Sequence, residues 1–530
     1  MPTLTWIGKD KVVNHHHDVP YRVLEHKYGF RAEDERDHTA TNSGNKIIHG
    51  DNLEALKSLL PEYEGRVKCI YIDPPYNTGN ENWIYNDNVN DPKIKKWLGE
   101  VVGKQGEDLS RHDKWLCMMY PRLKLLHKLL AKNGYILISI NYIYESAHLR
   151  LLCDEIFGSS NFIGEITWES TTQPINSGSA RFKLQQKIEP ILFYAKDKKE
   201  NDSFILEELE SDLKYPHNGK LGKCRLEIIE KSNAGGYERP TMQFEILGHK
   251  PRVGKRWQIG KDTADALLAN NRIEIDGGIV KKAIYPEDEI DKRKFKPFWS
   301  HFPADIADTA LNGKNLLNII MGEAIGFDTV KPPKLIEQLL SYMPKDAIVL
   351  DSFAGSGTTA HAVLNLNKKD GGNRKFILVE MENYAEDITA ERVRRVMKGY
   401  GEGKNATDGT GGAFDYYELG EPLFDNEDNL NENIAEKRIR EYIYYTETRQ
   451  HLERKRSDKN KYLLDKYTET GYYFYYERNK LTTLGMDTLD IVTEKADQYV
   501  VYADVCTLPE EFMLTHNIIF KKIPRDIKRF

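Results

Sequence analysis

Several features that would assign this chain to a special class of protein are missing. The cysteines are few and scattered, with no CxxC pair and no metal-ligand spacing (Cys69, Cys117, Cys153, Cys224 and Cys506). That pattern is typical of reduced thiols in a cytoplasm rather than of a disulfide framework. No apolar stretch approaches the ~20 residues that span a bilayer. The opening segment, MPTLTWIGKDKVV, lacks the apolar core of a signal peptide. These absences predict a cytoplasmic protein.

A large charge of one sign is also missing. The formal net charge is −6, which argues against a chain that coats nucleic acid over its whole surface. Local basic surface can still bind DNA. Two basic clusters stand out: Lys250, Arg252, Lys255 and Arg256, and Lys292, Arg293, Lys294 and Lys296. They are open to two interpretations, solvated loops or DNA contacts. The neighbouring Trp257 and Trp299 fit a core better than a base-stacking role.

Apolar strands and helical patterns alternate in two blocks of the chain. Strands are expected at 46–50, 67–72, 134–140, 346–351 and 375–380, and helices at 113–132, 146–157, 331–343 and 358–368. Pro121 predicts a kink in the helix over 113–132, and Asn133-Gly134 predicts its end. This alternation predicts an α/β fold with a doubly wound, mainly parallel, Rossmann-like sheet.

The composition divides the 530 residues into several parts. We expect an N-terminal arm (1–45), a first half of the α/β core (46–197), a polar insertion (198–315), a second half of the core (316–400), a linker (401–413) and a C-terminal α+β domain (414–530). The arm contains His15, His16 and His17. Adjacent histidines splay apart in most backbones, so a local cluster is favoured over a metal site, and we predict no bound metal.

The first motif is Asp73-Pro74-Pro75-Tyr76, at the end of the strand VKCIYI. Two prolines remove two backbone donors and fix two φ angles. The residue before each proline is held extended. The motif is therefore a stiff tongue with free carbonyls, a carboxylate and an aromatic face, which suits a flat group carrying an amine.

The second motif is DSFAGSGTT, in which a strand ends at Asp351 and a glycine turn opens a helix at Thr358. Such a turn lets a ligand approach the backbone and the helix N-terminus. It is neither GxGxxG nor a Walker A loop, so a phosphate ligand is not specially supported. Glu380 ends the next strand and can accept hydrogen bonds from a ribose diol. A glycine turn with a ribose acid suits S-adenosylmethionine, although a plain tight turn is the alternative.

Both motifs lie at carboxyl ends of strands, where ligands bind in such sheets. One crevice can then hold a methyl donor at the glycine turn and an amine acceptor at the tongue. Asp73 and the Pro74 carbonyl would accept hydrogen bonds from the amine, and Tyr76 would stack on the ring. A duplex hides such an amine, so the base would have to be flipped out.

Together these motifs resemble the amino-methyltransferases of DNA. The order, DPPY before FAGSGTT with a large insert between, resembles the β group of these permuted enzymes. Further segments, such as "DEIFGSSNFIGEITW" and "FDTVKPPKLIEQLL", are similar to the Mod subunit of type III restriction–modification systems. The resemblance spans most of the chain.

The resemblance implies roles for individual residues. The catalytic set is Asp73, Pro74, Pro75 and Tyr76, and the cofactor set is Asp351, Phe353, Ala354, Gly355, Gly357, Thr358, Glu380, Thr329, Lys331 and Asp51. Aspartate in the first place of DPPY is similar to N6-adenine enzymes. The family implies S-adenosylmethionine as cofactor, duplex DNA as substrate, target recognition in the 198–315 insertion, a homodimer, and a separate restriction subunit. Two alternatives stay open: a DNA-recognition subunit with weak methylation, and methylation of RNA or protein.

Overall fold

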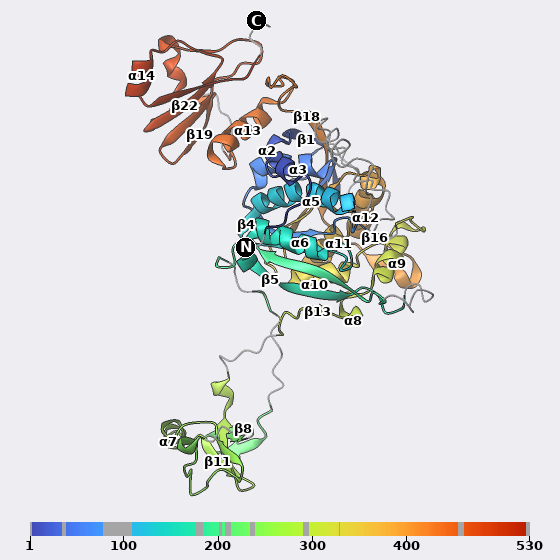
Figure 1. The fold of residues 1–530 in the computed structure, drawn as a ribbon, viewed down its shortest axis with the longest axis vertical. Coiled ribbons are helices and arrows are strands. Elements are labelled where there is room, and N and C mark those ends of the chain that lie inside the picture. The colour runs from blue at the N-terminus through green and yellow to red at the C-terminus, as the bar shows by residue number, and fades with distance from the viewer. Residues whose placement is uncertain are drawn as a thin grey trace. The chain divides into compact units, whose positions relative to one another are not determined.

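The computed structural model describes residues 3–33, 39–77, 109–174, 184–200, 204–206, 214–233, 239–289, 296–327, 329–453 and 460–525. The chain forms two compact units (Figure 1). One contains Met1–Ile205 and Trp299–Phe530, and the other contains Leu206–Phe298. Among the described residues, no helix is both long and apolar enough to cross a lipid bilayer.

The larger unit is built on a ten-stranded sheet. The strand order is β1 (Arg22–Arg31), β18 (Ala413–Pro422), β2 (Lys46–His49), β15 (Lys375–Glu380), β14 (Ile348–Asp351), β3 (Val67–Ile72), β4 (Leu130–Ser139), β6 (Ile188–Ala195), β5 (Phe162–Glu169) and β13 (His301–Phe302). The central run from β18 to β4 is parallel, whereas β1 and β6 pair antiparallel with their neighbours. The expected α/β class with a mainly parallel sheet is confirmed.

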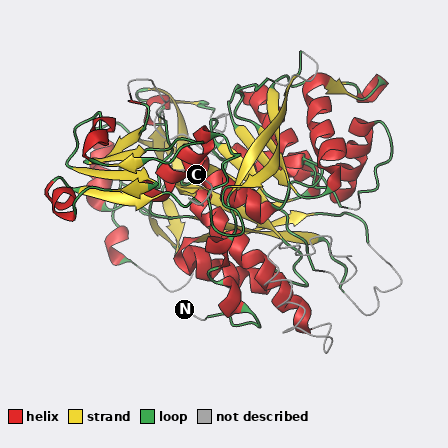
Figure 2. Cartoon of the chain, turned by 90° about the horizontal axis from the view of Figure 1, so that it is seen from above, coloured by secondary structure: helices red, strands yellow, loops and turns green. Residues whose placement is uncertain are grey.

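Helices cover this sheet in two groups (Figure 2). α3 (Asn52–Tyr63), α5 (Leu109–Leu129) and α6 (Ser146–Cys153) pack on one another, and α9 (Ala310–Met321), α10 (Pro333–Ser341), α11 (Thr358–Asp370) and α12 (Glu391–Lys398) form the second group. Ile70 and Ile72 join the core under the first group. Successive side chains of a strand point to opposite faces, so the buried Cys69 and Tyr71 face the other way. β3 is therefore covered on both sides, as its unbroken apolar run requires.

The junction between α5 and β4 differs from the sequence prediction. The helix ends at Leu129, and Asn133-Gly134 lies inside β4, so the predicted helix stop at this dipeptide is wrong. The register against β3 shifts between the pairs Val67–Leu130 and Cys69–Tyr135. A Cβ at Gly134 would lie 2.9 Å from the Val67 carbonyl oxygen. The glycine serves a close approach inside an irregular strand rather than a helix end.

Both flanking regions of the chain contribute to the sheet edge. β1 comes from the segment expected to be an arm, and β18 overlaps the expected linker and the start of the C-terminal domain. The two strands pair with each other, and β18 also pairs in parallel with β2. Polar and apolar residues are mixed in both strands, so neither contains the continuous apolar run that predicted the central strands.

The rest of the C-terminal region forms a separate small sheet. Its order is β19 (Leu463–Tyr467), β20 (Thr470–Phe474), β22 (Gln498–Ala503) and β24 (Ile518–Lys522), with α13 (Glu436–Thr448) and α14 (Glu510–Thr515) beside it. Tyr473 and Tyr476 are buried. Their burial shows that these tyrosines serve the packing of this region.

The smaller unit, Leu206–Phe298, lies within the expected insertion. It contains a four-stranded sheet in the order β11 (Ile273–Asp276), β12 (Ile279–Ile284), β8 (Gly222–Ile228) and β7 (His217–Gly219), a short pair of β9 (Glu230–Ser232) and β10 (Lys255–Trp257), and helix α7 (Lys261–Ala269). Trp257 is in its apolar core. The unit has a core of its own, as a module inserted between two halves of a sheet should have.

Candidate functional site

The tongue after β3 is fixed from below by α5. The indole Nε1 of Trp115, a fully buried residue of α5, donates a hydrogen bond to the Pro75 carbonyl oxygen at 2.8 Å. Asn77, the residue after the motif, is also fully buried and has φ +58°. A left-handed asparagine ends the extended segment. The DPPY tongue is therefore a fixed structure rather than a loose loop.

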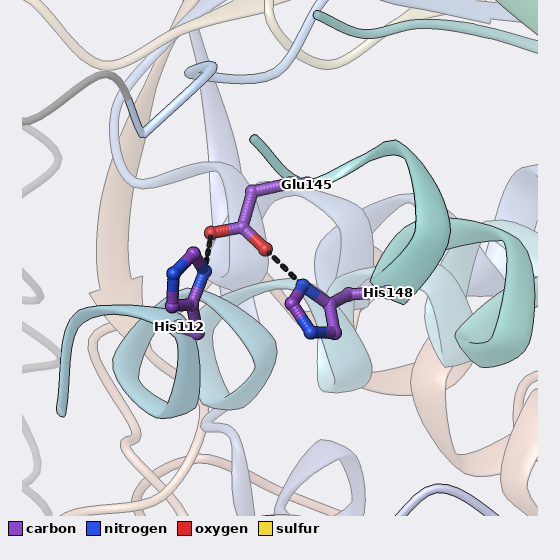
Figure 3. A group of neighbouring side chains, drawn as sticks. All are labelled: His112, Glu145 and His148. Atoms are coloured by element: carbon purple, nitrogen blue, oxygen red, sulfur yellow. Dashed lines mark hydrogen bonds and ion pairs between the residues drawn. The ribbon is translucent and has the colours of Figure 1, made fainter. Parts of the chain in front are cut away.

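A buried carboxylate ties this turn to two helices (Figure 3). Glu145 receives hydrogen bonds from His112 Nδ1 at 2.6 Å, from His148 Nδ1 at 2.9 Å and from the Asn77 amide. His112 comes from α5 and His148 from α6. Two imidazoles and a carboxylate are also the ligand types of a zinc site. Here the carboxylate of Glu145 already accepts hydrogen bonds from three donors. The cluster therefore serves as a structural support of the tongue.

The acceptor side of the site is a network around Asp73 and the ammonium of Lys331. Lys331 Nζ lies 2.9 Å from Asp73 Oδ2 and 2.7 Å from the Tyr76 hydroxyl. The Tyr76 hydroxyl donates to Asp73 Oδ1 at 2.7 Å. A further carboxylate, Glu189 of β6, lies 3.3 Å from Lys331 Nζ and 3.0 Å from the Tyr76 hydroxyl. One buried cation is thus shared by two carboxylates and a phenol.

Electrostatics keep the ammonium of Lys331 charged. Burial lowers the pKa of Lys331, but the carboxylates of Asp73 and Glu189 outweigh it, and the net pKa lies above its ordinary value. Burial and the same carboxylates raise the pKa of Tyr76 well above its ordinary value. Lys331 is therefore a cation and Tyr76 a neutral donor at physiological pH.

The second motif forms the expected glycine turn between β14 and α11. Gly355 has φ +51° and Gly357 has φ +82°. A Cβ at Gly355 would meet nothing closer than Phe327 Cε1 at 3.9 Å, whereas one at Gly357 would lie 3.1 Å from the Thr389 carbonyl oxygen. The space beside Gly355 is open, whereas Gly357 packs against the protein. Phe353 and Ala354, between them and the strand, are buried.

Two carboxylates line the turn. Asp351 accepts a hydrogen bond from the Phe353 backbone N–H at 3.0 Å and one from the Thr359 hydroxyl. Glu380 accepts from the backbone N–H groups of Gly355 at 2.7 Å and of Glu382 at 3.1 Å. Burial raises the pKa of Asp351 to about 7 and that of Glu380 to about 7, against the lowering effect of these hydrogen bonds. Both groups change charge near neutral pH.

The two motifs meet through the segment of Lys331. The Thr358 hydroxyl at the start of α11 donates to the Lys331 carbonyl oxygen at 3.1 Å. The ammonium of Lys331 contacts Asp73, which is 258 residues away in sequence. Thr329, two residues earlier, is exposed. The structure thus brings the predicted residues 331 and 358 together with the tongue.

Asp51 is the N-cap residue of helix α3. Its carboxylate caps α3 by accepting from the backbone N–H groups of Leu53 at 2.9 Å and Glu54 at 3.0 Å. The next residue, Asn52, donates to the Ser352 carbonyl oxygen at 3.3 Å. The segment therefore lies beside the glycine turn, while the carboxylate of Asp51 is engaged by its own helix.

The predicted basic clusters are only partly described. Arg252 and Lys255 lie 2.6 and 3.6 Å from the buried carboxylate of Glu230, so part of their charge is neutralised. Residues 292–294 lie outside the described residues. Trp257 is buried as expected, but Trp299 is 63% exposed, so a core role for Trp299 is wrong.

The histidines of the N-terminal segment form α2 (His15–Asp18). His15 and His16 are buried, and burial, with the positive charges nearby, lowers the pKa of His16 to about 3. A neutral, buried imidazole is a packing residue here.

Sequence reasoning missed Glu189, Trp115 and Glu145. Glu189 precedes an apolar strand and carried no motif, and Trp115 and Glu145 lie in or beside helices. A signal was available in part, because Glu189 is a lone acid at the start of the apolar segment PILFYA. Nothing in the sequence placed it beside Asp73.

Comparison with known proteins gives a family. Residues 67–391 match the family described as DNA methylase. The chain is 32% identical over 429 residues to the type III restriction-modification enzyme StyLTI Mod subunit of Salmonella typhimurium, covering 74% of this chain and 62% of that subunit. It is 30% identical to the EcoPI Mod subunit of Escherichia phage P1, covering 75% of this chain and 68% of that subunit. It is also 30% identical to the type II methyltransferase M.KpnI of Klebsiella pneumoniae, covering 67% and 84%.

Solved structures are similar at a lower level. The M1.HpyAVI–SAM complex is 16% identical with a TM-score of 0.31, covering 66% of this chain and 98% of that chain. The PvuII DNA methyltransferase (cytosine-N4-specific) is 14% identical with a TM-score of 0.34, covering 66% and 86%. The chain spans less than two thirds of the StyLTI subunit.

The family match runs from the first residue of β3 to the start of α12 and includes both motifs. It confirms the resemblance to DNA amino-methyltransferases that DPPY and FAGSGTT indicated. The chain belongs to the DNA methylase family.

Proposed function

We propose that this chain transfers a methyl group from S-adenosylmethionine to N6 of an adenine flipped out of duplex DNA, as the modification component of a type III-like restriction–modification system. The observation that carries the proposal is the meeting of the two motifs at Lys331. Its ammonium contacts Asp73 and Tyr76, and its carbonyl oxygen accepts from Thr358 of the glycine turn. The proposed amine site and the proposed nucleoside site therefore contact the same residue, Lys331.

The residues of the glycine turn fit S-adenosylmethionine. Gly355 leaves open space beside the backbone, and Glu380 offers carboxylate oxygens at the end of β15. Glu380 would accept hydrogen bonds from the ribose hydroxyls, and Phe353 and Ala354 would pack against the apolar parts of the cofactor. When bound, S-adenosylmethionine supplies a methyl group on a sulfonium, which an amine can accept.

The tongue would hold the acceptor. Asp73 and the Pro74 carbonyl would accept hydrogen bonds from the exocyclic amine, and Tyr76 would pack on the flat base. This positions the nitrogen without the need for a strong base, because orientation supplies much of the rate. A nitrogen–carbon bond to the methyl group would form as the carbon–sulfur bond of the sulfonium breaks, which leaves a neutral thioether, and the proton that the nitrogen loses would pass to water. Aspartate in the first place of DPPY favours adenine over cytosine.

Further parts of the proposal concern recognition and partners. The insertion, as a module with its own core, is the expected reader of the DNA sequence, and Lys250 is a candidate for a backbone contact. The relatives named as Mod subunits of type III enzymes favour a separate restriction subunit. A homodimer and a cytoplasmic location complete the proposal.

The test is expression of the chain in a bacterial host that lacks DNA methylation, followed by genome sequencing that reads modified bases directly. N6-methyladenine confined to one short sequence context is the expected result. Modified cytosine instead of adenine would overturn the choice of base. A folded protein that binds S-adenosylmethionine but leaves the DNA unmodified would favour a DNA-recognition subunit or an RNA or protein substrate. The Asp73→Ala variant is the matched control.

A further inference from the structure

The carboxylate of Asp73 is held at both of its oxygens by donors from this chain. Oδ2 accepts from Lys331 Nζ at 2.9 Å, and Oδ1 accepts from the Tyr76 hydroxyl at 2.7 Å. One hydrogen bond at each oxygen fixes the plane of the carboxylate. Each oxygen can accept a second hydrogen bond, and the side chain is 26% exposed. Asp73 therefore keeps acceptor capacity for an amine, in a direction that its two donors determine.

Glu189 contacts both of these donors. Its Oε2 lies 3.3 Å from Lys331 Nζ and 3.0 Å from the Tyr76 hydroxyl. The three N–H groups of the ammonium thus have three acceptors, which are Asp73, Tyr76 and Glu189. The Lys331 side chain is buried, so the loss of one acceptor would leave a buried donor without its partner. Glu189 therefore holds the ammonium and the phenol where they contact Asp73.

The sheet fixes the position of Glu189 itself. Glu189 is the second residue of β6 and lies directly opposite Trp168 of β5. Opposite residues of an antiparallel pair project from the same face. The indole of Trp168 is fully buried, and Lys331 Nζ lies 5.7 Å from its ring centroid. The next residue, Pro190, accepts a hydrogen bond from the Ile140 backbone N–H at 3.1 Å. β5 and β6 thus place a carboxylate and an aromatic face beside the ammonium.

We propose that Glu189 is a positioning residue of the acceptor site, which acts through Lys331 and Tyr76 to fix the plane of the Asp73 carboxylate. This inference rests on the proposed function and adds one residue to it. No group has to move when the amine binds, because the amine would add its hydrogen bonds to the acceptor capacity that Asp73 keeps. The loss of Glu189 should therefore slow methyl transfer and leave the binding of S-adenosylmethionine unchanged.

The charge of Glu189 gives this role a pH dependence that packing alone does not produce. Among the residues that the structure describes, the titratable groups that contact the Lys331 ammonium are Asp73, Tyr76 and Glu189. Burial lowers the pKa of Lys331, and the carboxylates of Asp73 and Glu189 together raise it above its ordinary value. Without the charge of Glu189, burial is opposed by Asp73 alone, so the pKa of Lys331 falls. The ammonium that orients Asp73 is then lost at a lower pH.

The experiment measures single-turnover methylation by the full chain, with saturating S-adenosylmethionine and a duplex DNA that carries its methylation site. Glu189→Gln keeps the size of the side chain and removes its charge, so the rate should fall by about ten-fold or more. The alkaline limb of the pH–rate profile should move to lower pH by about one unit or more. The dissociation constant of S-adenosylmethionine should change by less than about two-fold. The calorimetric stoichiometry of cofactor binding counts the folded protein. Glu165→Gln is the matched control, because Glu165 is exposed on the neighbouring strand β5.

Lys331→Met completes a double-variant cycle. Adding Glu189→Gln to Lys331→Met should lower the rate by less than about three-fold, because the main group through which Glu189 acts is already gone. The two variants that lack the lysine should also share one alkaline limb.

Three results would overturn the proposal. One is a Glu189→Gln variant with the rate of the unaltered chain. Another is a slower Glu189→Gln variant whose alkaline limb has not moved, because that result assigns Glu189 to packing alone. The third is a double variant in which the two losses multiply, as they do for independent residues. A failure of the proposed function is visible separately, because the unaltered chain would then produce no N6-methyladenine.

Discussion

Asp73 and Asp351 stand at the ends of two neighbouring parallel strands, β3 and β14, yet their surroundings are opposite. Asp73 is partly exposed and faces the ammonium of Lys331. Asp351 is buried and faces a hydroxyl and a backbone N–H, and burial raises its pKa to about 7. Asp73 is thus paired with a cation, whereas burial moves the pKa of Asp351 toward neutral pH.

The difference suits the two ligands. In the proposed function an uncharged amine needs an acceptor, which the carboxylate of Asp73 would provide. A cationic cofactor such as S-adenosylmethionine gains when a nearby acid becomes ionised, and Asp351 and Glu380 are poised to do so near neutral pH. Two halves of one sheet thus give the same kind of residue different partners.

The largest expected effect comes from Asp73. Asp73→Ala removes the acceptor for the amine, and methyl transfer should fall by about 10³-fold or more, as for other residues that orient a reacting group. The affinity for S-adenosylmethionine should stay within about two-fold, because the change is on the acceptor side. Single-turnover methylation and calorimetric cofactor binding give the two numbers. Full activity in this variant would show that Asp73 does not hold the amine.

Glu380→Ala should have the opposite effect to Asp73→Ala, with weaker cofactor binding and a nearly unchanged rate. Loss of hydrogen bonds from a charged group is worth about 1.5–3 kcal/mol, which is about 10- to 100-fold in the cofactor dissociation constant. The rate at saturating cofactor should change far less. Glu382→Ala, two residues on, is the control, because the Glu382 backbone N–H that contacts Glu380 remains. Equal effects of the two variants would contradict the assignment of Glu380.

Gly313→Ala tests how closely α9 packs against the segment around Lys331, which contacts both motifs. A methyl group there would press on the Val330 carbonyl oxygen at 2.4 Å, so the free energy of unfolding should fall by about 1–3 kcal/mol, as for other overpacked sites. The helix propensity of alanine would by itself favour the opposite sign. Gly326→Ala is the control, since nothing lies within 4 Å of its Cβ position. Denaturant unfolding compares the two, and a stabilised Gly313→Ala would refute the close contact.

The pH dependence of the free energy of unfolding should show the effect of burying Asp351. A carboxylate whose pKa is raised in the folded state stabilises the fold at low pH, and that contribution is lost as the pH rises through the folded value. For Asp351 the window runs from its ordinary 3.8 to about 7. Raising the pH from 5 to 8 should therefore lower the free energy of unfolding more in the unaltered protein than in Asp351→Asn, by about 1 kcal/mol or more. Identical pH profiles would mean that folding does not raise the pKa of Asp351.

The smallest effect is expected in the insertion. Lys250 is exposed and only loosely paired with Glu245 at 3.5 Å. If it contacts a phosphate, Lys250→Ala should weaken DNA binding evenly and reduce the salt slope by about 1. Arg252→Ala should instead destabilise the insertion, because it leaves the buried Glu230 with less compensation. An unchanged salt slope for Lys250→Ala would return this lysine to the class of solvated surface charges.

The parts of the fold that the sequence predicted are those with strong local signals. β3 and β14 are unbroken apolar runs, and α11 follows a glycine turn. The edge strand β1 and its neighbour β18 were not predicted, because each is only partly buried and mixes charged with aromatic residues. The helix stop placed at Asn133-Gly134 was wrong, since a glycine can serve a strand irregularity as well as a helix end.

The site shows the same division. The residues of both motifs were found because each motif is contiguous. The Lys331–Asp73 contact joins residues 258 positions apart, and Glu189 reaches Tyr76 over 113 positions. No local pattern encodes such a meeting, since it depends on the order of β14, β3, β4 and β6 in the sheet.

The pairing of β1 with β18 has a consequence for biosynthesis. Arg22 and Gly420, which share a hydrogen bond, are 398 residues apart. At about 5–20 residues per second, a ribosome needs roughly 20–80 s to deliver the second strand after the first. During that interval β1 lacks its ladder and the edge of β2 that β18 covers stays bare, and such edges invite pairing with other chains. A nascent chain that stalls before residue 413 would carry both motifs and still be prone to aggregate.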